Sequence, residues 1–371
     1  EQRENRATEQ ENTLLKQQQE LDRLSREKDK ARRKLLMGLV LFMIIVVILV
    51  TWSLVATRKR NLLLARQKRE ISAQRDEIEA QRDEIETQRD LVFNQKEAIE
   101  QYSVEITKSI EYAKRIQTST LPDLELLRKA VADYFVLFRP RDIVSGDFYW
   151  MAHVEDTTVL VVADCTGHGV PGAFMSMLGI SLLKEIVQKE YVTHPGVIMQ
   201  RIRKEIMRLL GQKGIQGEQR DGMDMSLIEI NRKEKQIRYA GAYNPLYLVR
   251  SSRITAPDIP EVKVHSSSGH ILYEIPADRM PVAIFDRMDK FTTHGFPIEE
   301  GDQLYLFTDG YPDQFGGEHG KKLKYKPFKE LILRNASQPM DEQNREMAST
   351  LDGWQGAYDQ VDDICVIGVR F

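Results

Sequence analysis

The chain has 371 residues, of which 42% are hydrophobic, and this is enough for one large domain or two of ordinary size. Its formal net charge of −3 provides no basic excess for neutralising phosphates, which argues against nucleic acid as a partner. Two cysteines, Cys165 and Cys365, are too few for a disulfide framework or a zinc site, so we expect reduced, buried thiols. The chain begins at Glu1 and not at methionine, which indicates a fragment or a processed product.

The N-terminal part contains one long apolar stretch. Residues 1–34 are dense in Glu, Gln, Lys and Arg and are typical of a charged helical connector. From Leu35 to Ala56 there is no charged residue, and a helix of that length covers roughly 30 Å, the thickness of a bilayer's hydrocarbon. A signal-peptide core is shorter, and a buried core helix is rarely free of charge for so long, so we predict a transmembrane helix over 35–57. Basic residues flank both ends, and the positive-inside rule therefore gives no orientation.

A seven-residue repeat follows the apolar stretch. One heptad position carries Ile71, Ile78, Ile85, Val92, Ile99 and Ile106, and the second core position carries Gln74, Gln81, Gln88 and Gln95. β-Branched residues at the first position favour two parallel strands, while glutamine at the second weakens their packing. The repeat predicts a marginally stable, dimeric coiled coil over 58–118, as suits a signalling helix that must change state. A single solvated helix with Arg/Asp/Glu pairs remains the alternative.

Beyond Pro122 the pattern changes to short apolar runs punctuated by Gly, Pro and Asp, which is typical of a strand-rich domain. We therefore place a globular domain at 119–371. We expect strands at 157–164, 225–231, 236–244, 245–250, 302–310 and 363–371. We expect helices at 172–191, 194–211 and 326–336. Strands joined by hairpin-like turns, with grouped helices, predict an α+β fold with antiparallel sheets.

Aspartates stand where these strands begin or end: Asp147, Asp164, Asp309 and the pair Asp362 and Asp363. Each alone is explained by a turn or a helix cap. Together they predict carboxylates that converge at one rim of a sheet, where they repel one another unless a cation lies among them. Mg²⁺ and Mn²⁺ prefer oxygen ligands, and two such ions sharing a carboxylate activate water for attack on a phosphoryl group.

The motifs that contain these acids resemble a known family. "SGDFYW", "ADCTGHGVPGAFMSMLG", "DGMDMSL", "YAGAYNPLYL", "LYLFTDG" and "DDICVIGV" are similar, in order, to motifs of the metal-dependent PPM (type-2C) protein serine/threonine phosphatases. They are most similar to the bacterial branch that includes the sporulation stage II protein E and the phosphatases of sigma-factor partner-switching systems. The resemblance covers about residues 120–371. It implies an αββα sandwich with two Mn²⁺ or Mg²⁺ ions at one end of the paired sheets.

The resemblance also implies roles for single residues. Asp164 would bridge both ions, the backbone carbonyl of Cys165 would bind one of them, and Asp147 would act beside the other through ordered water. The first ion's shell would be completed by Asp309 and Asp362, with Asp363 as the less certain ligand. Asp164 and Asp147 are thus the expected catalytic residues, and metal-activated water would attack phosphoserine or phosphothreonine without a covalent intermediate.

Four further residues are accessory candidates. His168 is a candidate proton donor, or a local hydrogen-bonding residue of its glycine-rich loop. Asp221 and Asp224 could aid a third metal, although a turn explains them more simply. Arg279 could meet an anionic substrate, or lie on the surface. Cys165 is not expected to act as a nucleophile, because the "CTGHGVP" loop has no arginine to cradle a phosphate.

These features predict a membrane-anchored, homodimeric phosphatase, with the span in a bacterial inner membrane and the catalytic domain in the cytoplasm. The resemblance implies a phosphorylated anti-sigma-factor antagonist, or a similar regulatory protein, as the substrate. Two alternatives are a catalytically silent module that binds a phosphoprotein at the membrane and a structural coiled-coil adaptor. A silent relative would be expected to lack ligands, whereas all four principal positions carry Asp, and an adaptor leaves the glycine-flanked acids without a purpose.

Overall fold

The computed structural model describes residues 2–215, 220–267, 269–286 and 288–371, so Glu1 of the predicted connector lies outside the described residues. The chain divides into two compact units, Glu1–Glu100 and Gln101–Phe371. The first unit is a single helical segment. It belongs to α1 (Gln2–Thr120), which ends just before Pro122 because proline cannot continue a helix.

Apolar side chains of the first unit are exposed, both along 35–56 and at the isoleucines of the heptad repeat. Among the residues that the structure describes, two helices are long and apolar enough to cross a membrane, α1 and the stretch Gly169–Lys189. The apolar part of α1 has no protein cover in this structure, whereas more than half of the second stretch is buried. The second stretch is therefore a core helix of the second unit.

Two antiparallel sheets form the centre of the second unit. The first has the order β2-β3-β4-β5-β9: β2 (Phe148–Val154), β3 (Thr157–Cys165), β4 (Met223–Asn231), β5 (Gln236–Ala242) and β9 (His294–Pro297). The second has the order β1-β13-β10-β6-β8-β7: β1 (Asp133–Arg139), β13 (Ile364–Arg370), β10 (Gln303–Phe307), β6 (Leu246–Ser251), β8 (His270–Ile275) and β7 (Lys263–Ser267). A small hairpin joins β11 (Phe315–Gly316) to β12 (Lys321–Lys322).

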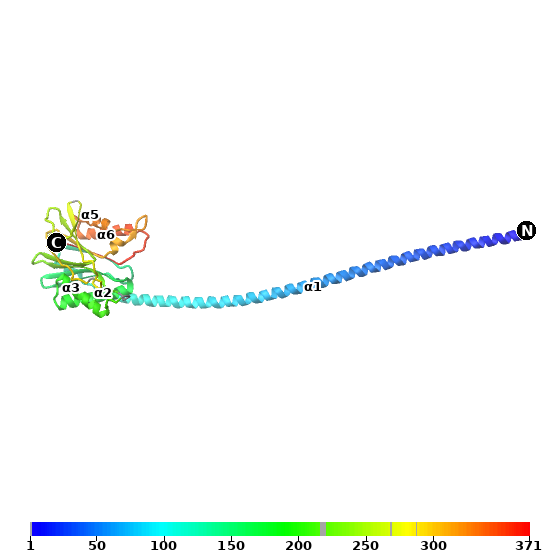
Figure 1. Ribbon diagram of the computed structural model, residues 1–371, viewed down its shortest axis with the longest axis horizontal. Helices are drawn as coiled ribbons and strands as arrows, with labels where there is room; N and C mark the ends of the chain where they lie inside the picture. The colour runs from blue at the N-terminus through cyan, green and yellow to red at the C-terminus, as the bar shows by residue number, and fades with distance from the viewer. Residues whose placement is uncertain (1, 216–219, 268, 287) are drawn as a thin grey trace. The chain divides into compact units, whose positions relative to one another are not determined.

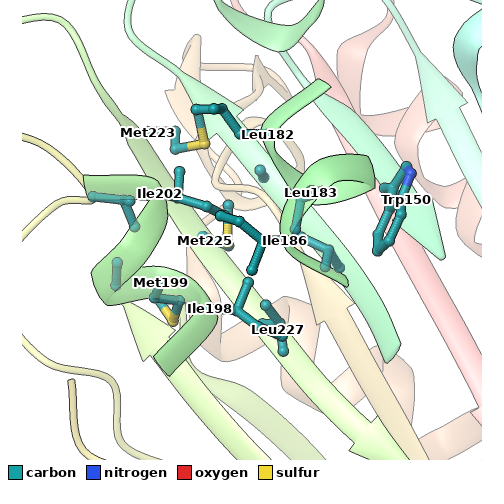
Figure 2. Close-up of a cluster of buried hydrophobic side chains, with 14 of the residues drawn as sticks. Trp150, Leu182, Leu183, Ile186, Ile198, Met199, Ile202, Met223, Met225 and Leu227 are labelled. Atoms are coloured by element: carbon teal, nitrogen blue, oxygen red, sulfur yellow. The ribbon is translucent and has the colours of Figure 1, made fainter. Parts of the chain in front are cut away.

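The side-chain alternation of the central strands explains the layers. In β3, Leu160 and Val162 pack into the cluster between the two sheets, while Val159, Val161 and Ala163 face the outer helices. A strand buried on both faces has to be apolar throughout, as β3 is. Figure 2 shows the outer cluster, in which residues of β4 such as Met225 meet side chains of α2 and α3.

Helices cover the outer face of each sheet (Figure 1). One side carries α2 (Gly169–Leu183), its π-helical continuation η2 (Lys184–Lys189) and α3 (Pro195–Leu209). The other carries α5 (Tyr325–Asn335) and α6 (Met340–Gln355), and two short helices are η1 (Leu124–Lys129) and α4 (Gly310–Asp313). The expected α+β fold and αββα sandwich are therefore confirmed for this unit.

The elements depart from the sequence-based expectations in several places. The helix expected at 172–191 begins earlier, at Gly169, and its last part is π-helical. The sequence analysis did not predict α6, and β1, β2 and the β7–β9 strands were also missed. The β7 strand is mostly exposed, and the first turn of α6 carries acids, so neither region shows a clear apolar pattern.

Candidate active site

The strand pairing brings the predicted acids to one edge of the sandwich. In the first sheet β2 begins where β3 ends, with Phe148 opposite Ala163, so Asp147 and Asp164 lie at the same edge. In the second sheet β13 begins where β10 ends, with Val366 opposite Phe307, so Asp362 and Asp309 are neighbours. The charges of Asp309 and Asp362, beside the second sheet, act on both Asp147 and Asp164, beside the first. The convergence of the four principal acids is thereby confirmed.

A cleft of about 330 Å³ opens at this edge. Its walls combine the loop after β3, the start of β4 and the residues before β13. The lining residues are Asp164, Cys165, Thr166, Gly167, His168, Met223, Asp224, Pro281 and Asp362. Hydrogen bonds between Thr166 and Gly222 in both directions tie the loop after β3 to the segment before β4.

The carboxylates lie close enough together to disfavour one another's charged form. Burial, and then the charges of neighbouring carboxylates, raise the pKa of Asp164 well above its ordinary value, and burial likewise raises that of Asp147. Burial followed by the charge of Asp362 raises the pKa of Asp309, and burial raises that of Asp362. Asp224 is a fifth acid at this edge and lies opposite Asp164 in the strand register. Burial and then the charge of Asp309 raise its pKa to about 7.

This set of groups fits a hard divalent cation, because buried oxygen donors that repel one another need a positive charge among them. In the described part of the chain, however, no three His, Cys, Asp or Glu side chains are arranged closely enough to hold an ion as they stand. The carboxylate of Asp147 is held in one orientation by a hydrogen bond. Its Oδ2 accepts a 2.6 Å hydrogen bond from Thr308 Oγ1, and Thr308 in turn accepts one from the Cys365 backbone N–H.

Asp363 has a different environment from the other acids. It is 2% exposed, and both of its carboxylate oxygens are used: Oδ1 accepts from the Arg141 N–H and Oδ2 from the Gly146 N–H, each at 2.7 Å. The side chain thus fixes the loop that leads to Asp147. This geometry favours a positioning role for Asp363 over the role of metal ligand.

The two cysteines are buried and unlinked, as expected. Burial raises the pKa of the Cys165 thiol well above its ordinary value, with the charge of Asp164 adding to the effect. A thiol that resists ionisation is a poor nucleophile, which supports the rejection of Cys165 as one. Its backbone carbonyl faces the loop before β2, since a Cβ built on Gly146 would lie 3.5 Å from that oxygen.

Two of the four accessory candidates line the cleft and two do not. His168 lines the cleft, and its Nδ1 lies 3.0 Å from Asp142 Oδ2, so it makes the local hydrogen bond that its loop favoured. Asp224 lines the cleft, whereas Asp221 and Arg279 do not contribute to its walls. The backbone carbonyl of Asp221 accepts a hydrogen bond from Gln212, and Arg279 is exposed.

Glycines are required where the loop before β2, the loop after β3 and the first turn of α2 meet. A Cβ on Gly172 would lie 2.2 Å from the Gly167 carbonyl oxygen, and a Cβ on Gly146 would lie 2.5 Å from the same atom. Gly167 itself has φ +85°, a left-handed conformation that glycine adopts without strain. A side chain at Gly146 or Gly172 would push apart the segments that carry Asp147 and Asp164.

One contact of this site was not foreseen. Gln117, in the last turn of α1, is 7% exposed and donates from Nε2 to the Ser145 carbonyl at 2.6 Å and to Ser176 Oγ at 2.8 Å. Its Oε1 accepts from the Ser145 N–H at 3.1 Å. The end of α1 is therefore bonded both to the loop before Asp147 and to α2. No sequence pattern distinguishes Gln117 from the other glutamines of α1, such as Gln101.

Comparisons with known proteins agree with this geometry. Over residues 155–371, more than half of the chain, the sequence matches the model of the family described as stage II sporulation protein E (SpoIIE). The phosphoserine phosphatase RsbU of Bacillus subtilis (strain 168) is 22% identical over 211 residues, which make up 56% of this chain and 54% of RsbU. The chain thus matches about half the length of that curated relative.

A solved structure is more similar. The SiaA-PP2C domain of Pseudomonas aeruginosa is 31% identical, with a TM-score of 0.61, and the match covers 72% of this chain and 98% of that domain.

Proposed function

Because this chain belongs to the SpoIIE family of PP2C-type phosphatases, we propose that it is a Mn²⁺- or Mg²⁺-dependent protein serine/threonine phosphatase. The observation that carries the proposal is the group of buried and half-buried carboxylates at one edge of the sandwich, where burial and then the charges of neighbouring carboxylates raise the pKa of Asp147 and Asp164. Oxygen ligands of this kind suit these two cations.

Specific residues would hold two ions. Asp164 would be shared between them, and Asp309, Asp362 and the Cys165 carbonyl would complete the shell of one. Such ions, when bound, activate water and neutralise charge on a phosphoryl group. Asp147 would stand beside the second ion, and its orientation is fixed by Thr308 on its carboxylate and by Asp363 on the adjacent loop.

The chain's other residues shape the cleft. Met223 and Pro281 give it an apolar wall beside the acids. His168, held by Asp142, lies at the rim, where an imidazole can donate a hydrogen bond or a proton to the leaving serine or threonine oxygen. Proton donation is thus a candidate role of His168, and Asp224 is a candidate ligand of a further, weaker metal ion.

The proposal includes a membrane anchor at 35–57 and a parallel dimer through 58–118. The charge-free run and its exposed apolar side chains support the anchor, and the sustained isoleucine repeat supports the dimer. The sandwich would face the cytoplasm of a bacterial cell, where phosphoproteins and divalent metal are present. A change in the pairing of the helix would reach the site through Gln117.

The substrate we propose is a phosphorylated regulatory protein similar to an anti-sigma-factor antagonist. The support is family membership and the relative RsbU, which is a phosphoserine phosphatase. A silent phosphoprotein-binding module remains the second candidate, and the retention of all four principal acids disfavours it.

Hydrolysis of p-nitrophenyl phosphate and of a phosphoserine protein, with Mn²⁺ or with chelator, tests the proposal. We expect turnover that requires metal and falls at least about a hundredfold in Asp164→Asn, because the shared ligand is lost. Turnover that is absent in a dimeric preparation, or unaffected by Asp164→Asn, would favour the silent module.

A further inference from the structure

A lysine-rich segment lies beside the acidic edge. Five lysines occur among residues 321–329, and no acidic residue occurs between Glu318 and Glu330, although the chain as a whole has a net charge of −3. The segment forms β12 and the first turns of α5. Lys322 and Lys329 pair with acids of the domain, whereas the other three lysines, Lys321, Lys324 and Lys326, are exposed and form no ion pair within the described part of the chain.

Backbone contacts hold this segment close to the candidate active site. The helix α4 starts directly after Asp309, and the Lys324 N–H donates to the Pro312 carbonyl of that helix at 2.6 Å. Lys322 Nζ lies 2.6 Å from Asp313 Oδ2, in the same helix. The three exposed lysines are therefore carried by a segment that is bonded to the turn after a proposed metal ligand.

The backbone of Lys324 is strained. Its φ is +72° with ψ 161°, a conformation that glycine adopts freely and that costs other residues about 1–3 kcal/mol. A lysine at this position gains no compensating contact from its exposed side chain. The strain is understandable if the charge itself has a function.

We propose that Lys321, Lys324 and Lys326, together called the lysine surface, recognise an acidic protein segment that flanks the phosphorylated residue of the substrate. This inference rests on the proposed function. A phosphoprotein that approaches the site meets a group of carboxylates, so a positive surface next to them is needed to attract an acidic chain. Charge complementarity selects an acidic partner, and exposure of the lysines makes the attraction sensitive to salt.

The test uses the full chain in detergent and two fluorescein-labelled phosphoserine peptides, one flanked by Asp and Glu and one by Ser and Gln. Anisotropy reports binding, and phosphate release with Mn²⁺ reports kcat/KM. The variant is the charge reversal Lys321→Glu/Lys324→Glu/Lys326→Glu. The matched control, Lys129→Glu/Lys233→Glu/Lys235→Glu, changes three exposed lysines around the opposite end of β4, which lies roughly 24 Å along the strand from Asp224.

We expect kcat/KM for the acidic peptide to fall about tenfold in the lysine-surface variant, and 0.5 M salt to remove most of the difference. The neutral peptide, p-nitrophenyl phosphate and the control variant should change less than about twofold, since the metal site itself is untouched. Lys324→Gly should lower kcat/KM for the acidic peptide while raising the thermal midpoint, because it removes the charge and the strain together.

Equal losses for both peptides, an equal loss in the control variant, or unchanged binding of the acidic peptide would overturn the inference. Binding of the surface to phosphatidylglycerol vesicles without any preference for the acidic peptide would also overturn it. If no variant and no wild-type protein hydrolyses p-nitrophenyl phosphate, the proposed function fails, and anisotropy still decides whether the lysine surface binds acidic peptide. If the triple reversal unfolds, Lys321→Gln/Lys326→Gln gives the same test with a smaller effect.

Discussion

Asp164 illustrates how one residue gains its role from its neighbours. The apolar residues of β3 before it are buried on both faces, so the strand is held in place by packing against both the second sheet and α2. The strand holds the half-buried Asp164 carboxylate at the cleft. Burial and then the charges of neighbouring carboxylates raise its pKa, so a cation bound there would favour its charged form.

Asp362 and Asp363 are adjacent in sequence but differ in their contacts, and substitution separates their roles. We expect Asp363→Asn to lower stability by about 1–3 kcal/mol, because an amide cannot accept from both the Arg141 and Gly146 N–H groups. Asp362→Asn should instead weaken Mn²⁺ binding with little change in stability. Urea unfolding and Mn²⁺ titration of both variants measure the two effects. The assignment is wrong if Asp363→Asn leaves stability unchanged and weakens metal binding as much as Asp362→Asn.

The contact of Lys329 with Glu274 predicts a pH-dependent contribution to stability. Burial alone would raise the pKa of Glu274, but hydrogen bonds from Lys329 and Lys263, together with their charges, hold it below its ordinary value. A lowered carboxyl pKa stabilises the fold above the unfolded pKa of about 4.3, and this stabilisation is lost as the pH falls through the lower folded value. Lys329→Met should therefore cost about 1 kcal/mol or less at pH 7, since Glu274 is partly exposed, and less still below pH 4.

Urea unfolding of the wild type and Lys329→Met at pH 7 and pH 3.5 provides this comparison. Lys326→Met serves as the control, because its ammonium group is exposed and has no ion partner among the described residues. A stability difference that widens toward low pH would contradict the predicted sign.

At the scale of elements, the last turn of α1 is part of the candidate active site. Gln117 closes a pair of hydrogen bonds with the backbone of Ser145 and a third with Ser176 on α2. Asp147, the proposed neighbour of a second ion, lies two residues after Ser145. The helix end therefore provides a direct mechanical connection between α1, α2 and the loop before β2.

We expect Gln117→Ala to raise the Mn²⁺ concentration needed for half-maximal activity by about three- to tenfold, because the loop before Asp147 loses its fixed position. Stability should fall by about 1–3 kcal/mol, since buried backbone groups of Ser145 lose their partners. Gln101→Ala, an exposed glutamine of the same helix, is the control. Equal behaviour of the two variants would show that the contact plays no part in metal binding.

The predicted coiled coil is tested by strengthening it. Replacing Gln81 and Gln88 with Leu fills two weak core positions, so we expect tighter dimerisation and an altered basal phosphatase rate. Sedimentation of residues 58–371 and turnover of the full chain measure the two outcomes. Tighter dimerisation with an unchanged phosphatase rate would show that the helix is only a spacer. A variant that still sediments as a monomer would contradict the parallel dimer.

At the scale of the whole molecule, the sequence was most informative where burial is complete. Strands such as β3, β10 and β13 are apolar runs with acids at one end, at the end of β3, just after β10 and just before β13, so both their existence and the convergence of their acids were predictable. The exposed β7 strand and the acid-rich start of α6 carry no such pattern and were missed. The remaining assignments depend on contacts between segments that are far apart in sequence. These are the backbone N–H groups that donate to Asp363 and the contact of the end of α1 with Ser145.

Calorimetric titration of the full chain with Mn²⁺ tests the central claim most directly, namely that the acids of both sheets hold shared cations. We predict two bound ions per chain in the wild type, and an affinity at least about tenfold lower for both in Asp164→Asn, because one carboxylate serves both sites. Asp221→Asn, which alters an acid outside the cleft, should retain both ions. Wild-type stoichiometry and affinity in Asp164→Asn would contradict the shared-cation claim.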